Sequence, residues 1–166
     1  MTAEASLLVD TVELRRHTGT RRDFGHDVEL DDLSAGERTV VDGRLHVDAV
    51  IEAVTEGIVV RGTATGTWRM PCRRCLEPTD GPLSVDIHEV FEAQPTEGET
   101  WPIDDERIDL EPVLREAALL ALPLVPLCRE DCPGPEPSRF PTGPPEEPGT
   151  QADPRWAALD DLTFDD

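Results

Sequence analysis

The sequence predicts an α+β domain, in which one main helix covers an antiparallel β-sheet, followed by a disordered acidic tail rich in proline. Three observations lead to this prediction. Apolar residues alternate with polar ones over about 44–70 and again over 83–91. Apolar residues recur at helical spacing over about 110–122, and eight of the 16 prolines lie within residues 133–154. No βαβ pattern and no internal repeat is visible.

The alternating stretch over residues 44–70 predicts a hairpin. Its first run places apolar residues at every second position: Leu45, Val47, Ala49, Ile51 and Ala53. Glu56-Gly57 predicts a turn, and the alternation resumes at Ile58 and ends at Met70. Gly62 and Gly66 fall on one face of this second run, which indicates close approach by another element or a strongly curved strand.

The flanking segments complete the predicted sheet. A break of proline, aspartate and glycine at 78–82 precedes a third strand over 83–91. Before the hairpin, residues 28–33 predict a short strand with a turn, and residues 7–14 fit either a strand or a helix.

One helix is well marked over about 110–122. Asp109 is the expected N-cap, Pro112 lies in the first turn and Pro123 ends the helix. Its broad apolar face predicts packing against the sheet. That face consists of Leu110, Val113, Leu114, Ala117, Leu120 and Ala121.

The composition changes after Cys132, so we expect the folded domain to cover residues 1–132. Residues 133–153 are rich in proline and contain no large aliphatic residue, which predicts a disordered linker. Residues 154–163 predict a short helix capped by Asp153. One face of this helix would carry an apolar stripe of Trp156, Leu159 and Leu162, which either binds a partner or folds back onto the sheet.

The charge excludes several classes of function. All 15 basic residues are arginine, and they stand against 36 acidic residues, which gives a formal charge of −21. Such a chain repels nucleic acid and anionic membranes. No apolar run is long enough for a membrane span, and residues 1–10 do not resemble a secretory signal. We therefore expect a cytoplasmic protein with no direct grip on nucleic acid.

Four cysteines form two pairs, Cys72 with Cys75 and Cys128 with Cys132. The spacings match the knuckles of a four-cysteine zinc site, which makes zinc a candidate cofactor. Two alternatives remain open. The thiols could be reduced and free of metal, or the first pair could be redox-active, because Arg73 and Arg74 would favour its thiolate.

No catalytic motif stands out. The four histidines, at positions 17, 26, 46 and 88, lack metal-ligand spacing to one another. Neither a nucleophile elbow nor a glycine-rich phosphate loop is present. We therefore expect a protein that is not an enzyme.

A combination of motifs resembles the YceD family, also called the large ribosomal RNA subunit accumulation protein family. It comprises MPCRRCLEP after the hairpin, HEVFEA, IDLEPVLREAALLALPLVPLCREDCPG and a final DPRWAALDDL. The resemblance extends from about Leu7 to Leu162, and the use of arginine alone resembles the actinobacterial branch.

This resemblance implies a cytoplasmic factor linked to accumulation of large-subunit ribosomal RNA, with no known enzymatic activity. The gene in this family commonly lies beside that of a small zinc-ribbon ribosomal protein. One departure concerns metal binding. Cysteine-rich members continue CREDCPG with a further cysteine knuckle, whereas here Gly134 is followed by Pro-Glu-Pro-Ser. An intact metal site would therefore have to bridge the two remaining pairs.

Charge and resemblance together favour a ribosome-biogenesis factor whose partner is a basic ribosomal protein or a large-subunit assembly intermediate. The candidate contacts are the acidic stretch 97–109 and the C-terminal stripe. The alternatives are a thiol redox protein and a direct RNA-binding module, the latter depending on an arginine patch. That patch would consist of Arg15, Arg16, Arg21, Arg22, Arg61, Arg69, Arg73 and Arg74.

Overall fold

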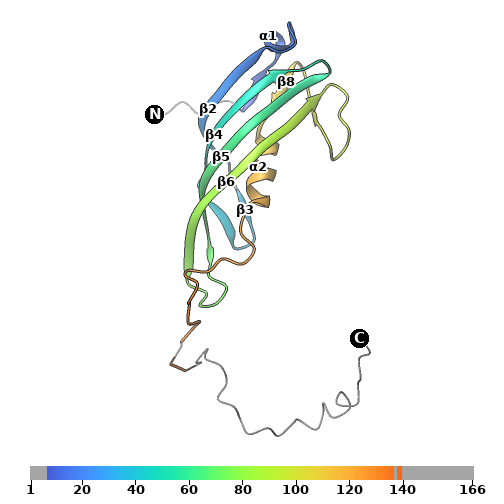
Figure 1. Ribbon diagram of the computed structural model, residues 1–166. Coiled ribbons are helices and arrows are strands. Elements are labelled where there is room, and N and C mark those ends of the chain that lie inside the picture. Colours follow the sequence, from blue (N-terminus) through green and yellow to red (C-terminus); the bar gives the residue numbers. More distant parts are fainter. Residues whose placement is uncertain (1–6, 137, 140–166) are drawn as a thin grey trace, which may run out of the picture.

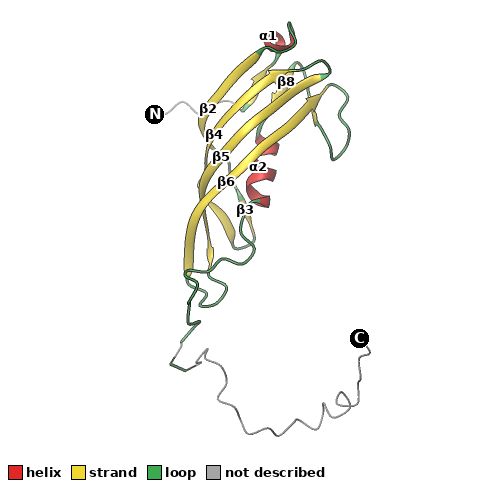
Figure 2. Ribbon diagram, in the orientation of Figure 1, coloured by secondary structure: helices red, strands yellow, loops and turns green. Residues whose placement is uncertain are grey.

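Three long antiparallel strands form the centre of the structure, and one helix lies on their concave side (Figure 1). The computed structural model describes residues 7–136, 138 and 139. The elements are β1 (Leu8–Asp10), α1 (Val12–Arg15), β2 (Arg21–Glu29), β3 (Ser34–Ala35), β4 (Arg38–Ala53), β5 (Gly57–Pro71), β6 (Pro78–Glu92), β7 (Trp101–Pro102), β8 (Arg107–Asp109) and α2 (Glu111–Leu120). Strand dominates over helix, as Figure 2 shows.

The main sheet has the order β2-β4-β5-β6-β7, with β3 paired to the start of β4. All these pairings are antiparallel except β6 with β7, which is parallel and covers only two residues. Near the N-terminus, β1 pairs with β8 in a separate two-stranded sheet. The predicted antiparallel hairpin and third strand are therefore confirmed as β4, β5 and β6.

The alternating residues of the hairpin face the core, as predicted. Val47, Ala49 and Ile51 on β4 and Ile58 and Ala64 on β5 are all at most 2% exposed. The predicted close approach at the glycines is also present. A Cβ on Gly62 would collide with the backbone of β4 at Asp48 and Ala49, so these two strands pack closer at that point than a side chain allows.

Helix α2 packs against β6 and closes the core with Val113, Leu114 and Ala118. Its N-cap is Leu110 rather than the predicted Asp109, although the Asp109 carboxylate still accepts a hydrogen bond from the Glu111 N–H at 3.0 Å. The predicted apolar face is wrong at Leu120, whose side chain is 78% exposed. Ala118 and Leu122 on either side of it are buried, so Leu120 lies at the edge of the covered face rather than beyond the sheet.

Three strand boundaries differ from the sequence prediction. β4 begins at Arg38 because Asp42 and Gly43, which resemble a turn, adopt positive φ inside an irregularity of the strand. β6 begins at Pro78, across the predicted break. β2 covers residues 21–29 instead of 28–33, and it was missed because only Phe24 and Val28 are buried among its charged neighbours.

The predicted linker 133–153 and helix 154–163 lie outside the described residues, apart from residues 133–136, 138 and 139. Within the described part of the chain, no helix combines the length and the apolar character needed to cross a bilayer.

Candidate metal centre

The four cysteines meet at one end of the sheet, opposite the end that carries α1 (Figure 1). Cys72 and Cys75 lie in the short loop between β5 and β6, and Cys128 and Cys132 come from the chain that follows α2. Their four sulfur atoms lie within 4.8 Å of one another. The sequence prediction that these two distant pairs form one cluster is therefore confirmed.

Backbone hydrogen bonds shape the loop that carries the first pair. The Cys72 N–H donates to the Glu77 carbonyl at 2.8 Å, and the Leu76 N–H donates to the Cys72 carbonyl at 2.9 Å. Leu76 closes this turn in the left-handed region, with φ of 65°. The turn brings both sulfur atoms to the same side of the loop, facing the second pair.

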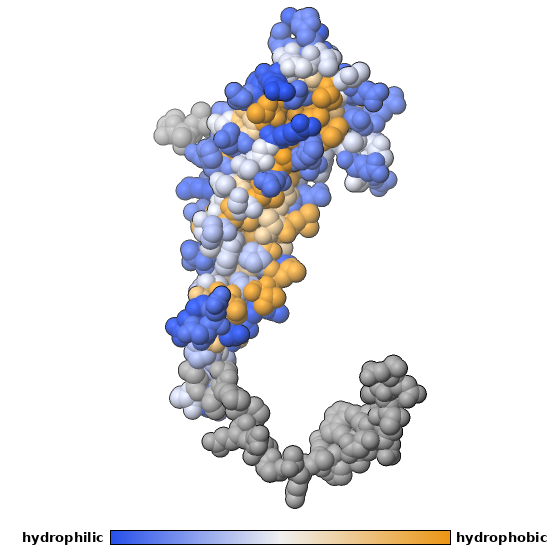
Figure 3. Space-filling model, in the orientation of Figure 1, coloured by the Kyte–Doolittle hydropathy of each residue, from blue (hydrophilic) through white to orange (hydrophobic). Residues whose placement is uncertain are grey.

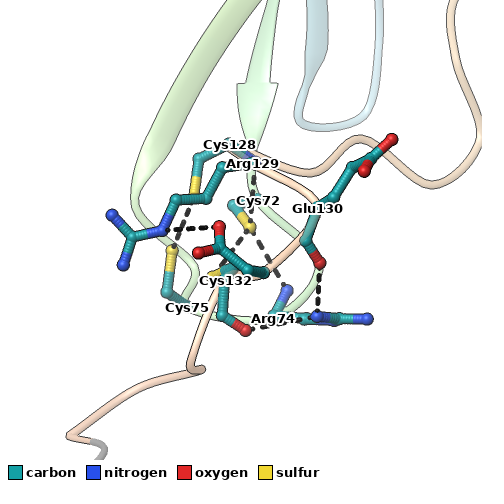
Figure 4. Close-up of polar contacts among 8 residues, drawn as sticks. Cys72, Arg74, Cys75, Cys128, Arg129, Glu130 and Cys132 are labelled. Atoms are coloured by element: carbon teal, nitrogen blue, oxygen red, sulfur yellow. Dashed lines mark hydrogen bonds and ion pairs between the residues drawn. The ribbon is translucent and has the colours of Figure 1, made fainter.

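Hydrogen bonds from Arg73 and Arg74 fasten the second loop onto the first, and Figure 4 shows those of Arg74. The Arg73 N–H donates to the Pro126 carbonyl at 2.9 Å. The Arg74 guanidinium donates to the carbonyls of Glu130 and Cys132 at 2.9 and 3.3 Å. Both arginines thus help to hold the cluster together.

The spacing of the sulfur atoms matches a tetrahedral ligand set. With metal–sulfur bonds of about 2.3 Å, the sulfur atoms of a tetrahedral site are roughly 3.8 Å apart. The sulfur of Cys72 lies 3.9 Å from that of Cys132, and the sulfur of Cys75 lies 3.8 Å from that of Cys128. Both short distances join one cysteine of each pair, so the four sulfur atoms together can hold a metal ion.

Cys72 is the most thiolate-like member of the cluster. Its buried sulfur accepts backbone N–H bonds from Arg74 at 3.5 Å and Cys128 at 3.4 Å. Backbone N–H groups, first that of Cys75 and then that of Cys128, lower the pKa of Cys72 from 9.0 to about 6. The sulfur of Cys132, above all, raises the pKa of Cys128 to about 12. Four thiolates would form together only if a cation offset their charge.

The other predicted contacts do not join this centre. Trp156, Leu159 and Leu162 lie outside the described residues. The acidic stretch 97–109 lies at the far end of the sheet, separated by the length of β5, which is about 46 Å for 15 residues. Its acidic side chains, including those of Asp104, Asp105 and Glu106, are exposed.

The arginines of the predicted RNA-binding patch are dispersed. Arg16 pairs with Glu13, and Arg21 pairs with Glu52, near the end that carries α1. Arg61 and Arg69 are eight residues apart on β5, which separates them by roughly 26 Å. Arg73 and Arg74 lie beyond them in the cysteine loop. The eight arginines are therefore spread along the length of the sheet, with Arg61 near Arg21 and Arg22 and with Arg69, Arg73 and Arg74 toward the cysteine end.

An apolar surface that the sequence prediction missed runs along α2 and the chain after it (Figure 3). Leu120, Leu124 and Val125 are 78%, 77% and 66% exposed. Leu120 also lines a groove of about 370 Å³ between α2 and β6, which we call the α2–β6 groove. The run Leu122-Pro-Leu-Val-Pro could have signalled this surface, because proline ends the helix while the apolar residues continue.

Comparison with known proteins agrees with the motifs around the cysteines. The family described as "Large ribosomal RNA subunit accumulation protein YceD" matches residues 60–163. Uncharacterised proteins of Mycobacterium tuberculosis and Mycobacterium bovis are each 36% identical over 168 residues, covering 92% of this chain and 79% of theirs.

An uncharacterised protein of Mycobacterium leprae is 31% identical over 131 residues, covering 74% of this chain and 60% of its own length. No solved structure matches the chain significantly. These mycobacterial relatives agree with the predicted actinobacterial branch. The chain belongs to the YceD family of large ribosomal RNA subunit accumulation proteins.

Proposed function

We propose that this protein is a non-catalytic, cytoplasmic factor that supports accumulation of large-subunit ribosomal RNA by binding a basic ribosomal protein. Membership of the YceD family supports the link to this RNA. The formal charge of −21 is the observation that favours a protein partner over the RNA itself. An acidic surface attracts a lysine- and arginine-rich protein and repels a polyanion.

The distribution of charge supports the same partner. Several of the arginines on the sheet are already paired with acids, such as Arg21 with Glu52 and Arg44 with Glu29. By contrast, Asp104 and Asp105 have no ion-pair partner within the described residues. The dispersed arginines leave no continuous basic surface in the part of the chain that the structure describes, so direct RNA binding has less support.

We further propose that the metal is zinc and that its role is structural. Four sulfur ligands in a tetrahedral arrangement are typical of structural zinc sites, which leave no open coordination position for catalysis. Cys72, Cys75, Cys128 and Cys132 would hold the ion and fasten the chain after α2 to the end of the sheet. A redox role has less support, because Cys72 and Cys75 lie in a turn between two strands rather than at a helix N-terminus.

Depletion of the protein from its host is expected to lower the ratio of large-subunit to small-subunit ribosomal RNA. Quantifying both RNAs from total RNA after depletion measures this ratio. Complementation with the full chain should restore it, and an empty vector serves as the control. An unchanged ratio in fully depleted cells would contradict the proposed function.

A further inference from the structure

We propose that the outer edge of β6 from Ser84 to His88 binds an extended basic segment of the partner, whose apolar side chains enter the α2–β6 groove. This inference rests on the proposed function and assigns a surface to the partner. Strand addition to a free sheet edge is a common mode of peptide recognition, in which backbone hydrogen bonds give affinity and alternate side chains give specificity.

The edge of β6 is free over most of its length. β5 occupies its inner side from Pro78 to Glu92, whereas β7 covers only Phe91 and Glu92 on the outer side. Within the described residues, no other strand pairs with this edge. A long unpaired edge of this kind presents a row of donors and acceptors to any extended chain.

The direction of the backbone groups on β6 follows from the hydrogen bonds near its two ends. Near the first end, the Glu77 carbonyl faces inward and accepts the Cys72 N–H at 2.8 Å; at the other, the Glu92 carbonyl faces outward and accepts the Ile103 N–H at 2.9 Å. Because backbone groups alternate along a strand, even-numbered residues of β6 face the free edge. Its pairing with β5 is continuous in register.

Proline limits the part of this edge that can pair. Pro78 and Pro82 are even-numbered, so the position that lacks an N–H faces outward in both, as expected on an edge strand. Ser84, Asp86 and His88 retain both outward backbone groups, whereas those of Val90 and Glu92 flank the pairing of Phe91 with Trp101 on β7. The segment able to accept another strand therefore spans Ser84 to His88.

The α2–β6 groove lies beside this segment and offers apolar contacts. Its apolar lining comes from β6, β7 and α2: Val85, Trp101, Val113, Ala117, Leu120 and Ala121. Every second side chain of an added strand would point toward α2 and into this groove. Such a strand would cover the side chain of Leu120, which the core leaves exposed.

Charge selects the occupant. The polar lining residues of the groove are Asp86, Glu89 and Glu116, and no basic residue lines it. The Glu89 carboxylate accepts a hydrogen bond from the Trp101 indole at 2.8 Å, while Asp86 and Glu116 have no ion-pair partner among the described residues. A segment that alternates apolar residues with lysine or arginine would place its apolar side chains in the groove and its cationic side chains on the other face of β6, the face of Asp86. The carboxylate of Glu116 adds to the negative potential around the groove.

Two other occupants fit less well. Residues 153–166 of this chain contain five aspartates and one arginine, so the groove would repel them. A second copy pairing through β6 would bring the same acidic residues against one another. A basic partner avoids both conflicts.

The test measures binding of a fluorescent 11-residue peptide of alternating valine and lysine to the purified full chain by anisotropy. A second peptide has the same side chains, but every second backbone amide is N-methylated. Methylation removes the N–H groups along the edge that would pair with β6. Three variants probe the surface: Glu116→Arg reverses one groove charge, Ser84→Pro removes an outward N–H, and Ser84→Ala is the matched control. Thermal unfolding checks that each variant remains folded.

We expect the unmodified peptide to bind the native chain, and N-methylation or Glu116→Arg to weaken binding by roughly tenfold. Ser84→Pro should weaken it by about threefold or more, and Ser84→Ala should not. No binding, or equal binding of both peptides, would overturn the proposal.

Two other outcomes would assign the groove to another occupant. If the Trp156→Ala chain binds the peptide more tightly than the native chain does, the occupant is this chain's own C-terminal segment. If sedimentation shows a dimer that forms through β6, the occupant is a second copy.

The outcomes separate this inference from the proposed function. If the edge binds the peptide but depletion leaves the RNA ratio unchanged, the function fails and the binding site stands. If depletion lowers the ratio and the Glu116→Arg chain restores it fully, the function stands and this edge is not the partner's site.

Discussion

Replacing Cys72 by serine is expected to abolish zinc binding and to lower the melting temperature by about 10 °C. Cys72 is buried, its sulfur accepts two backbone N–H bonds, and it lies 3.9 Å from the Cys132 sulfur. A serine hydroxyl is a poor zinc ligand, and losing the ion releases the chain after α2 from the sheet. Zinc content of the untagged protein and thermal unfolding measure both effects.

Arg129→Ser is the matched control for this loss. Arg129 lies between two of the cysteines, and its side chain forms an exposed ion pair with Asp131 at 3.3 Å. This variant should keep its zinc and its melting temperature. A Cys72→Ser chain that retains one zinc ion, or a native chain whose melting temperature is unaffected by a chelator, would contradict the structural zinc site.

Replacing Gly62 by alanine is expected to lower the free energy of unfolding by about 3 kcal/mol. The added Cβ would collide with the Asp48 carbonyl and would lie 2.6 Å from the Ala49 Cβ, so β4 and β5 would have to separate at the centre of the sheet. Urea unfolding of the purified chain measures the loss.

Gly25→Ala tests whether this effect comes from the close approach. Gly25 lies on β2, where an added Cβ meets no atom within 4 Å. Alanine there should leave stability unchanged or raise it by about 0.5 kcal/mol, because glycine is the more flexible residue in the unfolded chain. Equal losses at both positions would show that the β4–β5 contact is not limiting.

The sequence predicts the hairpin well because its inner face is buried along its whole length. Each second residue from Leu45 to Ala53 is apolar, which leaves one choice of face. β2 was missed for the opposite reason, since Phe24 and Val28 are its only buried residues. At the start of β6, proline resembles a break but marks a free edge. This distinction depends on which neighbours a strand has, and local sequence does not contain it.

The metal centre, too, is only partly predictable from the sequence. Spacing within each cysteine pair predicts metal ligands, but residues 76–127 separate the pairs, and only the fold brings them together. The contacts that fasten the two loops, from Arg73 to Pro126 and from Arg74 to Glu130, carry no sequence signal. Leu120 is expected in the core because helical periodicity identifies a broad apolar face without showing which edge of that face the sheet leaves uncovered.

The central claim is that this acidic protein acts on ribosomal RNA through a basic protein. The most direct test incubates the purified full chain with protein-free large-subunit ribosomal RNA and, separately, with proteins extracted from large subunits. At physiological salt, we predict no retention of the RNA and retention of one or a few basic proteins, weakening as salt rises. Tight binding of the protein-free RNA, with none of the extracted proteins retained, would contradict this account.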